Sequence, residues 1–421
     1  MGSRHCLDIA PFDIWSDEKG NYVPLKPNFL WVAHTYKARN IDWVQPFWIV
    51  ATEHPSLPNH DGKITLTIGG APVIFISEET FESGYHPGIP RANALIYVNP
   101  SLISMPDPIS HLLQAKPWTS PTRQEAELIF NTLKPRCSII AMNFVFRELI
   151  IELANNGRTY AKASLPSRVG GWSVSYHHNV GDAAFWDTKL PLARKREMSP
   201  FSQKVPSIFG DMTNYRIVDE GVLGPGIRVA GQAEFSSAGI RIRKGTEVRM
   251  TLAQHSFEDD DYVYHPDIIS GTQIAEITTR YPGQDLALAK IAPGVLFNNT
   301  MIFESPIPTK LLIGDAIGMN REWFFCDGCT TGVIAMKFGG VRFARNADDE
   351  ITLFSEFQPA SVWYGLAPTG GAQDIRDGIC GAPIVHESDG AVAGFFQYID
   401  DSGFCFSPHL DKLIDDEWEC Y

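Results

Sequence analysis

The stretch that decides the fold is DGICGAPIV, residues 377–385, near the end of the 421-residue chain. One glycine stands two positions before Cys380 and another directly after it, and a proline and a short apolar run follow. Glycine lets the backbone turn with a positive φ, and the apolar run is typical of a strand. Two interpretations are open: Cys380 is a packed core thiol in a tight turn, or a nucleophile in a cradle of backbone N–H groups.

Short alternating segments surround this turn from about residue 222 onward. Turn residues separate them at short intervals, which is typical of an all-β barrel or sandwich. The length of the region suits two small barrels in tandem. The expected strands are GIRVA, GIRIR, EVRMTLA, QIAEIT, DLALAKI, GVIAMKF, GVRFA, EITLF, PIVHE and AVAGFFQYI.

The first half of the chain mixes strand and helix patterns. IVAT, ITLTI and PVIFI are expected strands. Thr122 and Glu125 have the spacing of a capping box, and apolar residues follow at helical spacing. A second helix is expected to begin at Ser138 and to end before Asn155. These patterns predict an α+β arrangement.

The pattern divides the chain in two. Residues 186–215 carry prolines, serines and basic residues and are expected to form a linker or a surface strap. We therefore expect an α+β N-terminal region over residues 1–215, of unassigned role and ending in this linker. A double β-barrel domain is expected over residues 216–421, so the fold class is mainly β.

Composition excludes several classes of function. The chain is 44% hydrophobic and 20% charged, with a net charge of −14, which disfavours nucleic acid as a partner. The basic cluster at residues 194–196 fits a solvated linker. The longest apolar segment, residues 138–153, is too short and too charged to cross a membrane. No secretory signal is visible, which predicts a cytoplasmic location.

The cysteine pattern favours free thiols. Seven is an odd number, and reduced cysteines are expected in a cytoplasmic protein. Cys326 and Cys329 form a CxxC, but no second pair follows at zinc-like spacing, so two thiols in a turn are expected. The pair His177-His178 with Asp182 is likewise expected in a turn. The sequence predicts no metal and no cofactor.

Three segments of the β region carry residues of acyl-transfer chemistry. VRMTLAQHSF places His255 just after a strand, and GQDLALAKI places Asp285 just before one. An imidazole can remove the proton of a thiol, and a carboxylate can fix the tautomer of that imidazole. The order His255, Asp285, Cys380 therefore predicts a catalytic triad. Gly378 and Cys380 are the expected N–H donors to the oxyanion that forms during acyl transfer.

These segments resemble the chymotrypsin-like (trypsin-like) peptidase superfamily. TLAQHSF is similar to its T-A-A-H-C segment, DLALAKI to D-I-A-L-L-K-L, and DGICGAPIV to G-D-S-G-G-P with cysteine in the serine's place. The resemblance implies a chymotrypsin-like double β-barrel in which His255 is the general base, Asp285 the orienting acid and Cys380 the nucleophile. A cysteine nucleophile is known in the viral picornain-like branch.

The resemblance also implies a substrate pocket. Phe396, Gln397 and Tyr398 would border the substrate, and Asp374 would lie near the floor of the primary specificity pocket. Ile379 stands where secreted members have an acidic residue, so their activation by a new N-terminus is not expected here. The whole chain also resembles a group of fungal proteins without an established activity.

Together these features predict a trypsin-like cysteine peptidase that acts on a peptide through a thioester acyl-enzyme. One alternative is an acyltransferase or product-releasing cyclase of small-molecule biosynthesis, in which an amine, alcohol or carbon nucleophile replaces water. A second alternative is an inactive pseudo-peptidase that serves as a binding module. The expected partner is a peptide or acyl substrate, with neither nucleic acid nor membrane.

Overall fold

The structure is a computed structural model that describes most of the chain. The described residues are 8–14, 24–44, 47–53, 59–60, 63–65, 67–82, 97–98, 106–113, 120–145, 148–154, 165–178, 221–232, 234–300, 306–317, 323–330, 332–344, 353–366, 378–399 and 404–421. The expected linker over residues 186–215 lies outside them.

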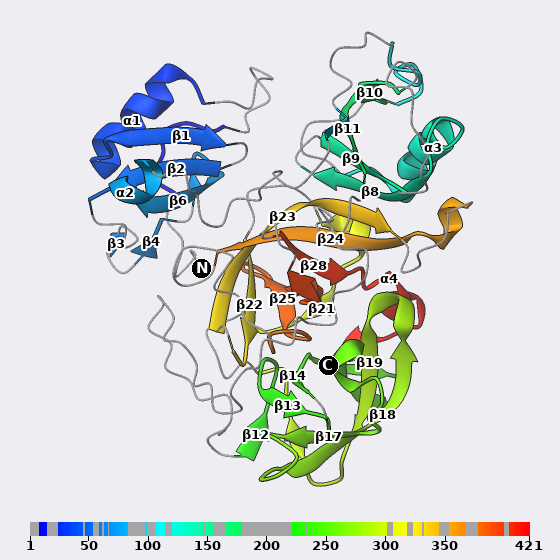
Figure 1. The fold of residues 1–421 in the computed structure, drawn as a ribbon. Coiled ribbons are helices and arrows are strands. Elements are labelled where there is room, and N and C mark those ends of the chain that lie inside the picture. Colours follow the sequence, from blue (N-terminus) through cyan, green and yellow to red (C-terminus); the bar gives the residue numbers. More distant parts are fainter. Residues whose placement is uncertain are drawn as a thin grey trace.

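The first barrel is an antiparallel sheet built almost entirely from residues 228–291 and is drawn in green in Figure 1. A short parallel pair, β12 (Val222–Leu223) and β20 (Leu296–Phe297), lies beside it. The strands of the sheet are, in order, β14 (Phe235–Ser237), β13 (Arg228–Ala230), β17 (Tyr262–His265), β18 (Thr272–Tyr281), β19 (Leu286–Ile291), β16 (Glu247–Ala253), β15 (Arg241–Lys244) and β29 (Glu419–Cys420).

The segment between β14 and β15 closes this sheet into a barrel. Ala238 donates its N–H to Ile227 next to β13, while Gly239 donates to Thr251 of β16. This short segment therefore connects β13, near one end of the strand order, with β16, near the other. Alternating apolar residues of the strands fill the interior, among them Val229, Leu252 and Ala289.

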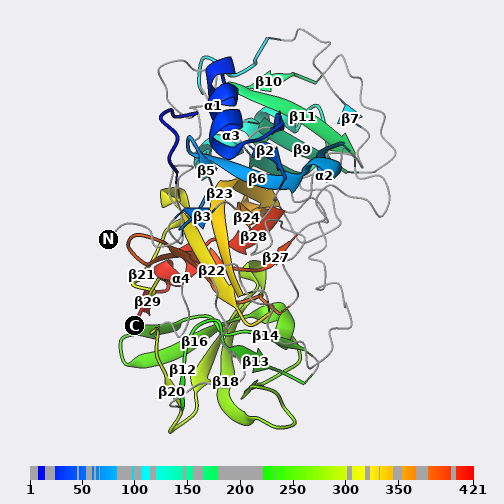
Figure 2. The same ribbon diagram turned by 90° about the vertical axis from the view of Figure 1, so that its left-hand side faces the viewer.

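The second barrel follows the first along the chain and lies against it (Figures 1 and 2). Its sheet closes where residues after β26 turn into β27, because Phe396 donates to Ala382 and Gln397 donates to Phe406. The strands are β21 (Lys310–Leu311), β26 (Ala391–Phe395), β25 (Pro383–His386), β22 (Phe324–Gly328), β23 (Gly332–Ala344), β24 (Gln358–Leu366), β28 (Phe404–Pro408) and β27 (Tyr398–Ile399).

The long strand β23 is shared by the second barrel and the N-terminal region. Its first half pairs with β22 in the barrel, whereas residues 340–344 pair with β8 (Ile139–Val145) of the N-terminal region. Gly340 permits this seam, since a Cβ at that position would lie 1.8 Å from the Phe144 carbonyl oxygen. The second barrel thus continues into a 13-stranded sheet.

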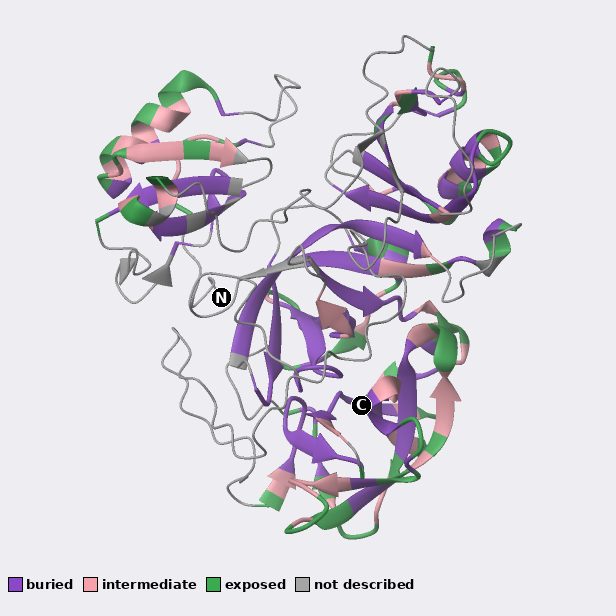
Figure 3. Cartoon of the chain, viewed as in Figure 1, coloured by how far each residue is buried: buried purple, intermediate pink, exposed green. Residues whose placement is uncertain are grey.

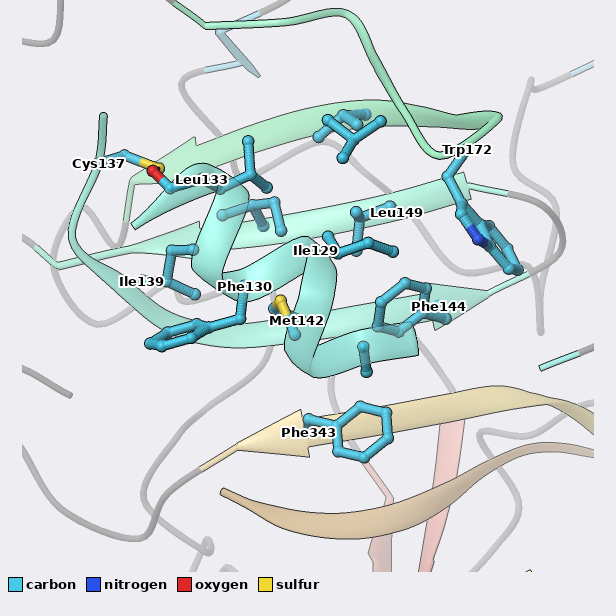
Figure 4. Packing of buried hydrophobic residues seen from close by; sticks show 14 of the residues in the cluster. Ile129, Phe130, Leu133, Cys137, Ile139, Met142, Phe144, Leu149, Trp172 and Phe343 are labelled. Atoms are coloured by element: carbon cyan, nitrogen blue, oxygen red, sulfur yellow. The ribbon is translucent and has the colours of Figure 1, made fainter. Parts of the chain in front are cut away.

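The part of the N-terminal region next to this seam is one layer of strands covered by one helix. The helix α3 (Arg123–Leu133) begins at Thr122, and Thr122 and Glu125 form the expected capping box. Figure 4 shows Ile129, Phe130 and Leu133 of α3 packed on the sheet, with Phe343 of β23 at the edge of the same cluster. The other strands of this layer are β9 (Glu148–Leu153), β11 (Trp172–His178), β10 (Arg168–Val169) and β7 (Tyr97–Val98).

A second, smaller unit is formed by the first 82 residues. Its four-stranded sheet packs on the second barrel through Ile49, Ile76 and Phe406. Its elements are α1 (Lys26–Tyr36), β1 (Asn40–Val44), β2 (Phe47–Thr52), β5 (Thr67–Ile68), β6 (Ala71–Ser77) and α2 (Glu78–Glu82), with the separate pair β3 (Asn59–His60) and β4 (Lys63–Ile64).

Three local expectations were wrong. Residues 139–153 form the antiparallel strands β8 and β9 instead of a helix, because both faces are buried and β-branched residues pack well on a pleated surface. Phe354 of the expected strand EITLF lies in a 3₁₀ turn, Phe354–Glu356, where it stacks on Phe357. His177 and His178 end β11 rather than forming a turn.

The fold class predicted from the sequence is confirmed: the chain is mainly β, with two barrels in its C-terminal half and an α+β N-terminal region. Figure 3 shows that the strands of the second barrel are buried along most of their length, whereas outer strands of the first barrel reach solvent. No helix among the described residues is long and apolar enough to cross a membrane.

Candidate functional site

The first barrel brings His255 and Asp285 together through the register of two strands. Strand β16 pairs with β19 so that Ala253 faces Leu286, and both candidate residues lie just beyond this last pair. His255 lies in the 3₁₀ turn Gln254–Phe257, and Asp285 follows the 3₁₀ turn Pro282–Gln284. Adjacent strand ends therefore explain why residues 30 positions apart meet.

Asp285 holds His255 with two hydrogen bonds, one to its backbone and one to its imidazole. Its Oδ1 accepts the backbone N–H of His255 at 2.8 Å, and its Oδ2 lies 2.5 Å from His255 Nδ1. The carboxylate is buried, with 4% of its side chain exposed, and the imidazole is 13% exposed. A buried carboxylate on Nδ1 fixes the tautomer and the orientation of the ring, and it leaves Nε2 for a further partner.

Cys380 of the second barrel lies close enough to this imidazole to affect its pKa. Burial lowers the pKa of His255, but the charge of the Cys380 sulfur and hydrogen bonds to Asp285 and Cys380 outweigh it, so the pKa is raised above 6.5. The Cys380 sulfur also lies 3.0 Å from the carbonyl oxygen of Gln397. The three side chains are therefore brought together from both barrels.

The backbone N–H groups around Cys380 are the proposed donors to an oxyanion. Gly378 has a φ of +92°, the left-handed region that favours glycine. Among the residues that the structure describes, none accepts a hydrogen bond from the N–H of Gly378, Ile379 or Cys380. Successive N–H groups of this kind bind anions, and an oxyanion is one such anion.

The carbonyl oxygens of the same three residues are all bonded. Ile379 accepts from the N–H of Ala382 at 3.0 Å, and Cys380 accepts from the N–H of Ser237 at 3.0 Å. Gly378 accepts from the Ser237 hydroxyl at 2.7 Å. The contacts from Ser237 could not be predicted from the sequence, because a serine in a short strand has no local pattern that ties it to a turn 141 residues away.

The residues expected to border a substrate take different positions. Phe396 is buried in the core cluster that contains Cys380. Gln397 contributes its carbonyl oxygen to the Cys380 thiol, and Tyr398 stacks on Phe406 with ring centroids 4.5 Å apart. Asp374 lies outside the described residues.

The other cysteines and histidines form no metal site in the described part of the chain. No disulfide joins the six cysteines found there. In the CxxC, Cys326 lies within β22, and the Cys329 sulfur lies 3.2 Å from the Gly378 carbonyl oxygen. Cys329 therefore contacts the turn at residues 378–380 and forms no site with Cys326.

Comparisons with known proteins are limited to the fold. No family model and no curated protein matches the chain. A solved glutamic acid specific serine protease, described as using a histidine triad in substrate binding, overlaps with 47% of this chain and 100% of its own length, at 13% identity and a TM-score of 0.35. The Thermobifida fusca Protease A overlaps with 47% of this chain and 98% of its own, at 16% identity and a TM-score of 0.34.

The Nocardiopsis protease gives a similar overlap, with 13% identity, 47% of this chain, 98% of its own length and a TM-score of 0.32. Because these overlaps are weak, the fold is assigned from the strand pairing described above. That pairing gives two closed antiparallel barrels, with His255 and Asp285 on the first and Cys380 on the second. The C-terminal half of the chain is a double β-barrel, as the sequence predicts.

Proposed function

We propose that the protein is a cysteine hydrolase whose catalytic residues are Cys380, His255 and Asp285. The observation that carries the proposal is the imidazole of His255, which interacts with Asp285 through Nδ1 and with the Cys380 sulfur. A thiol beside a protonated imidazole is a stronger nucleophile than an isolated thiol, because more of it is thiolate at neutral pH. The raised pKa of His255 supports such a pair.

The proposed reaction has two halves. The Cys380 sulfur attacks the substrate carbonyl carbon and a C–S bond forms, while the N–H groups of Gly378 and Cys380 bind the oxygen that gains the negative charge. His255 gives its proton to the leaving amine or alcohol as the old bond breaks. Water, deprotonated by His255, then attacks the thioester and releases the acid and the thiol.

The substrate is proposed to be a peptide or another acyl compound. The acidic net charge and the double-barrel fold support this choice over nucleic acid. The catalytic form needs a reduced thiol, so a cytoplasmic location belongs to the proposal. The resemblance to fungal proteins stays a prediction.

Selective labelling of thiols tests the proposal. The full-length protein is treated with substoichiometric iodoacetamide, and peptide mapping by mass spectrometry gives the modified fraction of each of the seven cysteines. We expect Cys380 to react at least ten times faster than the other six, and we expect His255→Ala to remove this difference. Alkylation of Cys380 no faster than that of the other cysteines would mean that Cys380 is a structural thiol, as in a binding module.

A substrate screen separates hydrolysis from acyl transfer. Peptide thioesters and esters are offered with and without an added amine, and the products are identified by mass. Release of the free acid in both conditions supports a hydrolase. Capture of the acyl group by the amine at a low amine concentration would instead identify a transferase on the same residues.

A further inference from the structure

The orientation of the N–H groups at residues 378–380 depends on contacts with other parts of the chain. Residues 378–380 belong to no strand or helix, so no regular ladder fixes their N–H groups. In one peptide unit the carbonyl and the N–H point in opposite directions, so a bond to the carbonyl also fixes the N–H of the next residue. A bond to the Gly378 carbonyl therefore fixes the N–H of Ile379, which lies between the two proposed oxyanion donors, and a bond to the Cys380 carbonyl fixes the N–H of Gly381 that follows them.

Two serines of the first barrel supply most of these donors. The Ser237 hydroxyl donates to Gly378 at 2.7 Å, and its N–H donates to Cys380 at 3.0 Å. The Ser236 hydroxyl donates to the same Cys380 carbonyl at 2.6 Å. Both serines lie on β14 and are fully buried.

Cys329 completes the contact from the second barrel. Its N–H donates to the Ser237 hydroxyl oxygen at 3.0 Å, which orients that hydroxyl as a donor toward Gly378. Its sulfur lies 3.2 Å from the Gly378 carbonyl oxygen and 3.6 Å from that of Ser236. The Gly378 carbonyl thus has two partners, both buried.

We propose that Ser237, supported by Ser236 and Cys329, is a positioning residue that holds the nucleophile turn in the conformation that binds the oxyanion. This inference rests on the proposed function, because it assigns a role within the same site. Ser237 does not touch the reacting atoms; it acts through the Gly378 carbonyl. Without its hydroxyl, the peptide between Gly378 and Ile379 loses one of its two buried partners and can rotate. This rotation moves the Ile379 N–H directly and shifts the flanking N–H groups of Gly378 and Cys380 through the backbone.

Two chemical probes of Cys380 separate this role from a general loss of structure. p-Nitrophenyl acetate acylates the thiolate: a C–S bond forms, a tetrahedral oxyanion appears, and p-nitrophenolate leaves. Iodoacetamide alkylates the same sulfur by displacing iodide, and no oxyanion forms. Only the first reaction therefore depends on the cradle, while both depend on the thiolate and on His255.

Ser237→Ala is the main variant and Ser407→Ala is its control. Ser407 is also fully buried on a strand and accepts one hydrogen bond, from Trp363 at 2.8 Å, but it makes no contact with residues 378–380 among the described residues. In Ser237→Ala we expect acylation of Cys380 to slow by about 10–100-fold and alkylation to stay within about twofold of the wild type. Ser407→Ala should change neither rate.

A second variant keeps the test decisive if Ser237→Ala folds poorly. Ser236→Ala leaves the Ser237 N–H on the Cys380 carbonyl, so a smaller loss, of about 3–10-fold in acylation alone, is expected. Thermal melting curves of all variants show whether they are folded under the conditions of the assay. Equal slowing of both reactions, or no slowing of acylation in either variant, contradicts the role of the serines.

Failure of the proposed function has a different signature. In that case the wild-type Cys380 reacts with both probes no faster than free N-acetylcysteine, and no variant is needed to see it. That result overturns the positioning role as well. Fast reaction in the wild type with an unchanged ratio of the two rates in Ser237→Ala overturns the positioning role alone.

Discussion

The two barrels differ in how they hold their part of the site. The first barrel closes on its own strands, and its adjacent strand ends bring His255 and Asp285 together with two hydrogen bonds. The second barrel is also closed, but its strand β23 continues into the sheet of the N-terminal region, and the turn at residues 378–380 is held by serines of the first barrel. The proposed base and acid are thus positioned by local strand pairing, whereas the proposed nucleophile depends on contacts from distant parts of the chain.

The largest expected effect is the removal of the nucleophile. Cys380→Ala should reduce turnover to the level that binding and the N–H cradle alone provide, roughly 10³–10⁴ over the reaction in water. The fold should survive, since the change in volume is small, with a cost of about 1 kcal/mol. Turnover of an ester or peptide and a melting curve check both statements. Full activity in the alanine variant would show that the second barrel does not supply the nucleophile.

The next variant breaks the contribution of the first barrel. Asp285→Asn keeps the size of the side chain but loses the carboxylate on His255 Nδ1, so the imidazole adopts the wrong tautomer and loses its charge partner. We expect turnover to fall on the order of 10²–10⁴-fold. Asp260→Asn is the control, because Asp260 is a buried carboxylate of the same barrel that accepts from Gln232. Equal losses in the two variants would point to damage of the barrel instead.

The seam between the second barrel and the N-terminal region should be sensitive to charge. Arg342 of β23 and Glu152 of β9 form a buried ion pair at 2.5 Å, with 4% and 7% of their side chains exposed. Arg342→Met leaves Glu152 buried without this partner, which should cost about 3–5 kcal/mol of unfolding free energy in urea denaturation. The exposed pair of Arg243 and Glu419 in the first barrel offers the control. Arg243→Met should leave the midpoint unchanged, and similar shifts in both variants would contradict the contrast.

A smaller effect is expected from a single methyl group in the nucleophile turn. In Gly378→Ala the new Cβ would lie 2.4 Å from the Phe235 ring and 2.7 Å from Thr330, at a backbone φ of +92°. Strain and overlap together should cost about 3 kcal/mol and lower the rate of acylation. Gly245 also has a positive φ but has open space around it. Gly245→Ala should cost only about 1–2 kcal/mol, without a change in rate. A larger loss of stability in Gly245→Ala than in Gly378→Ala would argue against the close contact of Gly378 with β14.

The sequence predicts what is local in this molecule and misses what is not. The capping box at Thr122 predicted α3, and the alternation in β16 and β19 predicted the strands whose ends meet at the site. Residues 139–153 were expected to be helical, because a run that is buried on both faces has no clear period of two. The contacts of Ser236 and Ser237 span 144 and 141 residues, and no pattern within either segment encodes them.

Titration of His255 tests most directly whether the two barrels form one site. Histidine labelled with ¹³C at Cε1 is followed by NMR in the wild type and in Cys380→Ala, and His255→Gln assigns the signal among the 12 histidines. The pKa of His255 is raised above 6.5 in the folded protein, so its contribution to stability is complete below about pH 6.5 and is lost as the pH rises through the raised value. Burial lowers the pKa of His255, and without the sulfur only Asp285 counteracts this effect. Removal of the sulfur should therefore lower the pKa. A pKa of His255 that is the same in both proteins would contradict the pairing of His255 with Cys380.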